Sequence, residues 1–508
     1  MAETGRVTII GAGPGDPGLI TLRAAQCIRE AEVIVYDHLV GPEILRHASP
    51  KARLIYAGKQ GGRHTIPQGE INALLVAEAR KGAVVARLKG GDPFIFGRGG
   101  EEAEVLKEAG IPFEVVPGVS SAIAVPAYAG IPLTHRSHTA SVAFVTGHED
   151  PTKGKSSLDW PTLAGMGTLV VLMAVKNLSA VTENLIDHGK DAATPAALIR
   201  CGTTPDQETL TGTLGDIARK AEEVGFAPPS ILVVGGVVAL RETLNWFETK
   251  PLFGRGIVIT RPEAQAEGFG EMLRAAGARV ILFPVIRVAP PETWEKLDEA
   301  LGRIEEYRWI IFTSANGVVF FFRRLREIGR DLRDLKGIRI AAIGPATAAS
   351  VEALGIRVDL VPEEFVSEGV VKAFAGKELR GGRVLLPRAA EARDVIPGGL
   401  AALGARCDIA TTYRTIRSDR SASELEPLFA DGKVDVVSFT SPSTVKNFLA
   451  IMGPGFRLPP GVRIACIGPV TAAAARKAGL PVDILQERFT IPGMVEALVA
   501  YFKKDKSG

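Results

Sequence analysis

The stretch "VTIIGAGPGDPGLIT" (7–21) places Gly11, Gly13 and Gly15 directly after an apolar run, and Asp37 follows about twenty residues after Gly15. Glycines at this place, with a later acidic residue, are typical of a dinucleotide site. The third glycine position of that fingerprint holds Asp16, however, with Pro14 and Pro17 where the next helix should begin. A carboxylate there opposes a pyrophosphate, so a nicotinamide-dependent oxidoreductase is disfavoured. A ligand-free turn and a site for a cationic cofactor such as S-adenosylmethionine stay open.

A second stretch, "RLKGGDPFIFGRGGEE" (87–102), ends another apolar run in two glycines and an aspartate. Glycines let the backbone approach a ligand closely, and Asp92 could hold a ribose hydroxyl or an amino group. The same residues also make a good turn without any ligand. Arg98 and Glu101 are spaced as an i,i+3 helix pair, and they could equally relay a proton.

The composition restricts the remaining chemistry. The chain has 508 residues with a net charge of +3, too small to indicate a nucleic-acid-binding protein. Its four cysteines lie far apart, and His135-x-x-His138 is the only ligand-like histidine spacing, so we predict no metal site. No run approaches the ~18 apolar residues of a membrane span, and no signal peptide is recognisable. We therefore expect a cytoplasmic protein without membrane or nucleic-acid partners. All seven histidines precede residue 190, which indicates two functional units, the second working without imidazole.

The elements that must position these residues fall into two halves. The segment 243–256 separates Gly-rich loops from a fresh strand-like run at 256–262, and the second half repeats itself. The stretch beginning "IAAIGPATAAS" at Ile340 returns as "IACIGPVTAAA" at Ile464, each after a related strand and turn (310–318 and 437–445). Short apolar runs alternating with Ala-rich helical segments are typical of buried parallel strands. We predict two similar α/β lobes with a cleft between them. The first half also divides into two α/β lobes, at about residue 136.

Several collinear motifs of the first half together carry a resemblance to a known family. They are "GAGPGDPGLITLRA", "VIVYDHLV", "AGKQGGRHTIPQGEIN", "RLKGGDPFIFGRGGEE" and "VPGVSSAIAVPAYAGIPLTHR". Over about residues 5–247 the chain strongly resembles the uroporphyrinogen-III C-methyltransferases of the tetrapyrrole methylase family. The resemblance implies two α/β lobes with S-adenosylmethionine between them, no metal, and a homodimer formed through this half.

The resemblance also implies roles for single positions. Two departures from the family pattern are Leu172-Met173-Ala174 for its Tyr-Met-Gly, and Ser120 for a common threonine. Asp37 matches the proton acceptor and Lys59 the proton donor, while Arg98, Glu101 and Arg136 match positions that face the tetrapyrrole. From the residues alone, either Asp37 or the Arg98–Glu101 pair could take the proton that methylation releases. The positions that match cofactor contacts are Pro14, Gly90, Gly91, Asp92, Ile95, Ser120, Ser121, Met173 and Gly202.

The second half, over about residues 254–503, resembles uroporphyrinogen-III synthase. The carrying motifs are "TRP" (260–262), "FTSANGV" (312–318), "IGPATA" (343–348), "TYRT" (412–415), "FTSPSTV" (439–445) and "IGPVTA" (467–472). The resemblance implies that Tyr413 assists departure of the substrate hydroxyl. Thr313, Ser314, Thr440 and Ser441 stand in turns at strand ends that could seat substrate carboxylates, although such residues are also ordinary helix N-caps.

Together these observations predict a bifunctional enzyme of tetrapyrrole biosynthesis. Its second half would cyclise hydroxymethylbilane to uroporphyrinogen III with inversion of the last ring. Its first half would methylate that product twice to precorrin-2, an intermediate of cobalamin and sirohaem synthesis. The alternative is a methyltransferase fused to a non-catalytic tetrapyrrole-binding module. We expect the methyltransferase at 1–247 (lobes 1–136 and 137–247), a linker at 248–254 and the synthase at 255–508. The expected synthase lobes are 255–288 plus 415–505, and 289–414.

Overall fold

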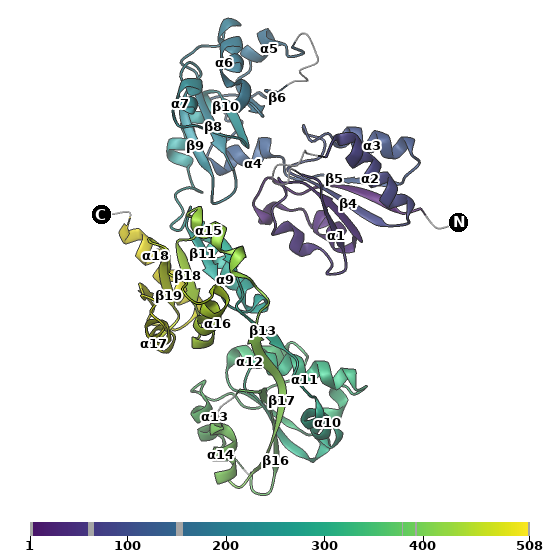
Figure 1. Ribbon diagram of the computed structural model, residues 1–508, viewed down its shortest axis with the longest axis vertical. Coiled ribbons are helices and arrows are strands. Elements are labelled where there is room, and N and C mark those ends of the chain that lie inside the picture. The colour runs from purple at the N-terminus through teal and green to yellow at the C-terminus, as the bar shows by residue number, and fades with distance from the viewer. Residues whose placement is uncertain (1–3, 59–65, 149–155, 378, 392–393, 506–508) are drawn as a thin grey trace. The chain divides into compact units, whose positions relative to one another are not determined.

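A computed structural model describes residues 4–58, 66–148, 156–377, 379–391 and 394–505. Contacts between Cα atoms divide the chain into two compact units. One contains residues 1–255 with 273–279 and 502–508, and the other contains 256–272 and 280–501. Each unit carries two separate five-stranded sheets, so the chain has a four-sheet α/β fold (Figure 1).

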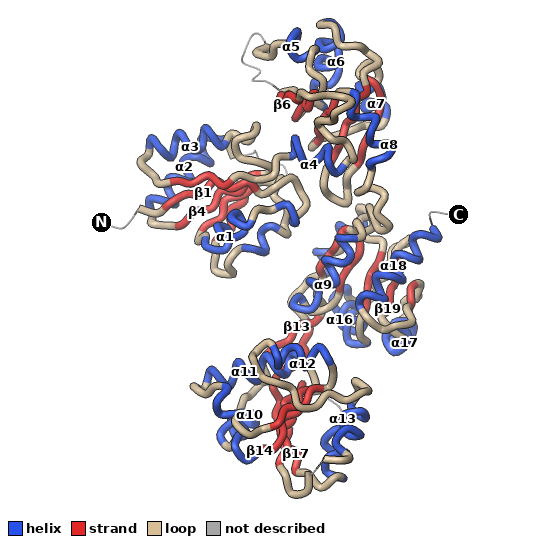
Figure 2. Tube along the Cα trace, turned by 180° about the vertical axis from the view of Figure 1, so that it is seen from behind, coloured by secondary structure: helices blue, strands red, loops and turns tan. Residues whose placement is uncertain are grey.

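The first sheet of the first unit is entirely parallel and has the strand order β3-β2-β4-β1-β5. Its three central strands, β2, β4 and β1, are short and largely buried because helices cover both faces of the sheet (Figure 2). Helices α2 and α3 pack on one face through Leu75 and Leu106, and α1 packs on the other through Ile28. The elements are β1 (Arg6–Gly11), α1 (Leu22–Glu30), β2 (Val33–Tyr36), β3 (Arg53–Tyr56), α2 (Gln68–Arg80), β4 (Val84–Lys89), α3 (Gly99–Glu108) and β5 (Phe113–Val116).

The second sheet of this unit is mixed, in the order β6-β7-β10-β8-β9. Only β6 and β7 pair in parallel, and the other neighbours are antiparallel. Helix α4, within the segment expected in the first lobe, packs on this second sheet, because Ala122 and Val125 share a core with Val170 and Ile199. The elements are α4 (Ser121–Tyr128), β6 (Val142–Thr146), α5 (Trp160–Ala164), β7 (Thr168–Leu172), α6 (Leu178–Asp187), β8 (Pro195–Arg200), β9 (Glu208–Thr213), α7 (Ile217–Glu223), β10 (Ser230–Val234) and α8 (Arg241–Leu244).

The second unit begins with a sheet of order β12-β11-β18-β19-β20, so strands from both ends of the half join one sheet. The pairs β11–β18, β18–β19 and β19–β20 are parallel. Val258, Phe439 and Phe448 lie in its core. The elements are β11 (Gly256–Ile259), α9 (Glu263–Ala275), β12 (Arg279–Leu282), α15 (Glu426–Ala430), β18 (Val436–Phe439), α16 (Pro442–Met452), β19 (Arg463–Cys466), α17 (Pro469–Lys477), β20 (Ile484–Leu485) and α18 (Ile491–Asp505).

The other sheet of this unit has the order β13-β17-β16-β14-β15, with β13 as an antiparallel edge. The proposed lobe boundaries at 288/289 and 414/415 fall inside β13 and β17, which pair with each other. The repeat recurs in three dimensions: Asp359 accepts a hydrogen bond from the Ile340 amide, as Asp483 does from that of Ile464. The elements are β13 (Ile286–Ala289), α10 (Glu295–Gly302), β14 (Tyr307–Phe312), α11 (Ala315–Glu327), β15 (Arg339–Ala342), α12 (Pro345–Glu352), α13 (Ser367–Phe374), β16 (Arg383–Ala389), α14 (Val395–Ala402) and β17 (Arg406–Arg417).

Candidate functional sites in the two halves

Three loops meet at the carboxyl edge of the first parallel sheet, where ligands favour α/β folds. Gly13 of the loop after β1 and Gly91 of the loop after β4 exchange backbone hydrogen bonds, of 3.3 and 2.7 Å. A Cβ atom on Gly118, in the loop after β5, would lie 2.3 Å from the Gly91 carbonyl oxygen and 2.7 Å from the Gly11 Cα. The three loops therefore pack backbone against backbone, which only glycine allows.

Asp16, which breaks the dinucleotide fingerprint, ties the opening loop to its surroundings. Its Oδ1 accepts a hydrogen bond from the Gly18 amide (2.8 Å), and its Oδ2 accepts one from the Tyr128 hydroxyl (2.7 Å). The Asp16 amide donates to Thr203 Oγ1 at 3.0 Å, so the loop is joined to the second sheet's elements. Burial, with the hydrogen bond to Asp16 as a further cause, raises the pKa of Tyr128. Because the Asp16 side chain is acidic and its backbone amide already donates to Thr203, this loop is poorly suited to bind a pyrophosphate.

Asp92 and Ser120 hold the adjoining loops of the candidate cofactor site. Asp92 accepts from the Phe94 amide through Oδ1 (2.8 Å) and from the Gly118 amide through Oδ2 (3.1 Å). Ser120 is the N-cap of α4 and accepts from the Ala122 amide, and Ser121 is the first residue of the helix. Ile95 is 41% exposed in the loop after β4. These side chains thus maintain the backbone that lines the edge.

Strained backbone gathers in the loops that the sequence singles out. Among the described residues, six that are not glycine have a positive φ: Phe96, Arg98, Met173, Cys201, Thr203 and Phe489. Five of these flank or belong to the candidate methyltransferase site, and such outliers cluster at functional sites. Met173 is half exposed after β7. Gly202 abuts Val125 of α4, where a Cβ would approach a methyl carbon to 2.4 Å.

Asp37 lies at the end of β2 above a buried charge cluster that our sequence reasoning missed. Arg87 Nη2 is 3.5 Å from Asp37 Oδ2, and Arg87 Nε is 3.1 Å from Glu102 Oε1. Lys89 Nζ lies 2.8 Å from the same oxygen, which also accepts from Gln68 Nε2. Burial, and next the Arg87 charge, lower the pKa of Lys89, while Glu102 opposes that shift. The sequence did contain a signal for this cluster: Arg87 and Lys89 stand at i and i+2 in an apolar strand, and charged residues at such positions need a buried partner.

Arg98 and Glu101 form the i,i+3 pair, with Nε–Oε1 and Nη2–Oε2 distances of 2.8 and 2.6 Å. Both side chains are more than half exposed, and no described contact joins them to Asp37. The hydrogen bond from Arg98 lowers the pKa of Glu101, which makes this carboxylate a weaker base. Arg136 is exposed in the turn between His135 and Thr139. Lys59, the other predicted proton carrier, lies outside the described residues.

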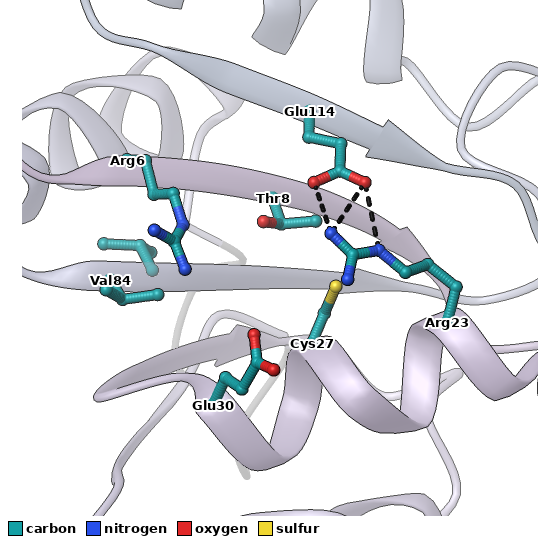
Figure 3. A pocket seen from close by; sticks show the side chains of 8 residues that line it. Arg6, Thr8, Arg23, Cys27, Glu30, Val84 and Glu114 are labelled. Carbon is teal, nitrogen blue, oxygen red and sulfur yellow. Dashed lines mark hydrogen bonds and ion pairs between the residues drawn. The ribbon is translucent and has the colours of Figure 1, made fainter.

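A pocket of about 370 Å³ lies at the amino ends of the same strands, away from all these residues (Figure 3). It is lined by Arg6 and Thr8 of β1, by Glu114 of β5, and by side chains of α1. Arg23 closes on Glu114 in a forked pair, with contacts of 2.9 to 3.1 Å. Its charges are balanced, and none of the predicted site residues lines it, so this pocket lies apart from the candidate cofactor site.

In the second unit, a pocket of about 210 Å³ is lined by residues from both sheets' elements. Thr440, Ser441 and Tyr413, all predicted site residues, lie in its wall. Thr313 and Ser314 precede α11, whose Asn316 also lines the pocket. The remaining lining residues are Arg261, Pro262, Gln265, Ile286, Val288, Thr415, Thr444 and Ile467.

The hydroxyls around this pocket are connected to one another. Tyr413 Oη and Ser314 Oγ are 2.9 Å apart, and Ser314 also accepts from the Gly317 amide as the N-cap of α11. Ser441 caps α16 in the same way, through the Thr444 amide. Tyr413 is 8% exposed and stacks on Phe320, so its hydroxyl is held in one place. The repeat thus places a hydroxyl-capped helix N-terminus from each sheet beside the pocket.

Two searches of the described residues bear on cofactors and partners. In the described ranges, no group of three or more histidine, cysteine, aspartate or glutamate residues could hold a metal ion. Within the same ranges, no helix has the length and apolar character needed to cross a membrane.

Comparison with known families matches both halves. The tetrapyrrole (corrin/porphyrin) methylases match residues 6–218, and the family of uroporphyrinogen-III synthase HemD matches residues 267–496. A solved structure of uroporphyrin-III C-methyl transferase from Thermus thermophilus, complexed with S-adenyl homocysteine, is 39% identical. It aligns with 46% of this chain and 100% of its own, with a TM-score of 0.41.

Two curated relatives extend this result. The S-adenosyl-L-methionine-dependent uroporphyrinogen III methyltransferase of Methanosarcina barkeri is 56% identical over 47% of this chain and 95% of its own. The porphyrin biosynthesis protein HemD of Ruminiclostridium josui is 39% identical over 98% of both chains. Matched along almost its whole length by the latter, the chain belongs to that family of porphyrin-biosynthesis enzymes, as a fusion of a tetrapyrrole methylase with a uroporphyrinogen-III synthase.

Proposed function

We propose that this protein converts hydroxymethylbilane to uroporphyrinogen III in its second half and methylates that product twice, to precorrin-2, in its first half. The observation that carries the proposal is the presence of two separate candidate sites, one in each half, both at the carboxyl ends of parallel strands. Each half matches the family model of one enzyme, and the two enzymes catalyse consecutive reactions, which supports the proposal.

The residues of the first site fit S-adenosylmethionine. The sulfonium cofactor carries no phosphate, and the loops offer glycine backbone at Gly90 and Gly91 with carboxylates at Asp16 and Asp92. When bound, the cofactor supplies a methyl group to the substrate. We propose that these residues contact it: Pro14, Gly90, Gly91, Asp92, Ile95, Ser120, Ser121, Met173 and Gly202.

The chain's own groups then orient the substrate and remove a proton. Arg98 and Arg136 are exposed guanidinium groups suited to substrate carboxylates, and Arg98 would exchange its Glu101 partner for one of them. Asp37 is the proposed base, because it follows β2 at the carboxyl edge of the sheet, in a loop whose Leu39 lies against Gly90 of the candidate cofactor site. The proposed proton donor is Lys59.

The arginine roles make a first prediction. Arg98→Ala and Arg136→Ala should each raise the KM for uroporphyrinogen III about tenfold or more, because each removes a charge-assisted hydrogen bond. The Kd for S-adenosylmethionine, measured by calorimetry, should stay within about twofold of the wild type. Arg219→Ala removes an equally exposed ion pair on α7 and serves as the control. Unchanged KM values in both variants would contradict the proposed binding of substrate carboxylates by Arg98 and Arg136.

In the second half, the proposed acid is Tyr413. Its hydroxyl donates to the departing substrate hydroxyl while Ser314 holds it through the 2.9 Å contact. The Thr313–Ser314 and Thr440–Ser441 turns, which begin α11 and α16, seat substrate carboxylates near helix N-termini. Such a site needs no imidazole, which agrees with the absence of histidine from the second half.

The decisive experiment supplies the whole protein with hydroxymethylbilane and S-adenosylmethionine and identifies the products by mass and isomer. We expect doubly methylated product derived from isomer III. If only uroporphyrinogen I forms, the second half is a non-catalytic binding module. If isomer III accumulates unmethylated, the methyltransferase assignment fails. Binding of a nicotinamide dinucleotide in a parallel titration would revive the oxidoreductase alternative.

We also propose a homodimer formed through the methyltransferase half, which the resemblance to its family supports. Sedimentation equilibrium of the full chain should give twice the 53.8 kDa mass of one chain. A concentration-independent mass of one chain contradicts it.

A further inference from the structure

The pocket of the synthase half has an unbalanced charge. Among its lining residues, Arg261 is the one cation, and no aspartate or glutamate is present in the wall that the structure describes. The other polar groups are neutral: the hydroxyls of Tyr413, Thr440 and Ser441 and the amides of Gln265 and Asn316 are among them. A guanidinium stays protonated in proteins, so the pocket is electropositive at every physiological pH.

Arg261 itself is held but not neutralised. It follows β11 and is partly buried, and its Nη2 donates to Gln265 Oε1 at 3.2 Å. No ion pair with a carboxylate is found for it within the described residues. Burial lowers the pKa of Arg261, which reflects lost hydration without a compensating anion. A desolvated charge without an ionic partner is costly, and such a cost is commonly offset by a ligand of opposite charge.

The internal repeat provides a second, independent observation. In one sheet Ile259 of β11 lies opposite Ser438 of β18, so Arg261 and Thr440 each follow two residues later. In the other sheet Leu385 of β16 lies opposite Ile310 of β14, so Arg388 and Thr313 each follow three residues later. Both repeats therefore carry an arginine beside the threonine that precedes a capped helix.

The two equivalent arginines differ in their partners. Arg388 is buried, and its Nη2 lies 2.6 Å from Asp394 Oδ1. Arg261 has the neutral Gln265 as its described side-chain partner and faces the pocket. One repeat thus neutralises its arginine within the protein, and the other leaves the charge available.

We propose that Arg261 binds a carboxylate of the tetrapyrrole substrate in the synthase pocket. This inference rests on the proposed function of the second half, since hydroxymethylbilane carries acidic side chains on its rings. A forked guanidinium matches a carboxylate in two parallel hydrogen bonds and fixes its orientation as well as its position. Arg261 would hold one end of the linear substrate while its last ring is inverted. The pocket's hydroxyl groups would place no charge beside the reacting end of the substrate.

Steady-state kinetics of the full-length protein test this role. In Arg261→Gln, the KM for hydroxymethylbilane should rise about tenfold or more, because hydrogen bonds to a charged group are lost, while kcat stays within about threefold. Arg261→Lys keeps a point charge without the forked guanidinium, so its KM should lie between those of the wild type and Arg261→Gln. In the two-site binding isotherm of uroporphyrinogen III under reducing conditions, the Kd of the synthase site should rise in parallel and lose part of its dependence on salt, while the Kd of the methyltransferase site stays unchanged.

Arg287→Gln is the matched control. Arg287 lies on β13 between two pocket-lining residues, Ile286 and Val288, but its half-exposed side chain pairs with Asp419 outside the lining. Its KM should equal that of the wild type, and thermal unfolding should show all variants folded. An unchanged KM and an unchanged Kd of the synthase site in Arg261→Gln would overturn the binding role of Arg261 while the wild type still makes isomer III. A wild type that makes only isomer I would instead overturn the proposed function.

Discussion

Three buried charged side chains of β4 and α3 in the methyltransferase half, Arg87, Lys89 and Glu102, hold one another. Glu102 is fully buried on α3, and one of its oxygens accepts from Arg87, Lys89 and Gln68. Arg87 extends this cluster to Asp37, the proposed base, at 3.5 Å. We infer that the cluster fixes the position of the Asp37 carboxylate, because its partner Arg87 is itself held by Glu102 and leaves Asp37 few alternative rotamers.

Removing the central carboxylate should therefore be costly. Glu102→Gln leaves Lys89 buried without an anion and Arg87 with Asp37 alone at 3.5 Å, so the free energy of unfolding of the methyltransferase half should fall by about 3–5 kcal/mol. Glu101→Gln changes the neighbouring, half-exposed glutamate and should cost no more than about 1 kcal/mol. Urea denaturation followed by circular dichroism measures both values. Equal, small losses would show that the cluster contributes nothing beyond surface ion pairs.

Glu78 gives a pH dependence whose sign follows from its partners. Its side chain is 5% exposed, and a hydrogen bond from Lys81, with the Arg53 charge as a further cause, lowers its pKa below the ordinary 4.5. A depressed folded pKa contributes stability above the unfolded pKa, and this stability is lost as pH falls through the folded value. Glu78→Gln should thus cost about 1–3 kcal/mol at pH 7 and progressively less below about pH 4.5. Glu104→Gln, exposed on α3, should show no such trend in urea midpoints.

At this scale, the sequence singled out loops that the structure brings together at one sheet edge, but it did not indicate which contacts their side chains make. From the sequence, the Asp16 carboxylate was expected to disfavour phosphate binding. Its hydrogen-bond partners Tyr128 and Thr203, which lie 112 and 187 residues away, were not predicted. Such contacts depend on tertiary packing, which local spacing does not encode. Arg87 and Lys89 were available as charged residues in an apolar strand, but their partner Glu102 lies on a helix that only the fold brings beneath them.

Among the elements, the candidate cofactor site depends on strand ends whose backbones are in direct contact. The loops after β1, β4 and β5 touch through Gly11, Gly91 and Gly118. In Gly118→Ala the new Cβ would overlap the Gly91 carbonyl oxygen, so the loops must separate at a cost of about 1–3 kcal/mol. We expect the affinity for S-adenosylmethionine to fall at least tenfold by calorimetry, while hydroxymethylbilane cyclisation persists.

Gly100→Ala is the control for this substitution, because a Cβ at Gly100 meets no atom within 4 Å. It lies in the first turn of α3, where alanine suits a helix better than glycine, so stability should hold or rise slightly. Wild-type cofactor affinity in Gly118→Ala would show that the loop contact is not part of the cofactor site.

Element types and their alternation were predictable, since short apolar runs and Ala-rich segments follow distinct periodicities. The sequence was a poorer guide to which sheet each helix or strand packs against. Helix α4 follows β5 in the chain but packs on the second sheet through Val125, and β13 pairs with β17 as an antiparallel edge. An apolar helix face or a four-residue strand fits several neighbours, and the choice is made by the whole core.

For the whole molecule, the two halves should act as independent catalytic units on one chain. Each half has its own sheets and its own cores. Full-length Gly118→Ala, at an S-adenosylmethionine concentration below its raised Kd, should convert hydroxymethylbilane to uroporphyrinogen III and methylate that product only slowly. Full-length Tyr413→Phe, which lacks the proposed acid, should cyclise hydroxymethylbilane at least tenfold more slowly yet methylate uroporphyrinogen III that is supplied to it.

An equal mixture of these two variants, with hydroxymethylbilane and S-adenosylmethionine, should restore formation of precorrin-2, because the product of one variant can diffuse to the intact site of the other. Mass and isomer analysis over time measures this flux, and each variant alone is the control. If the wild type, at the same concentration of each intact site, forms precorrin-2 much faster than the mixture does, the intermediate passes preferentially within one chain. Fusion would then serve transfer of the substrate rather than joint production of two enzymes.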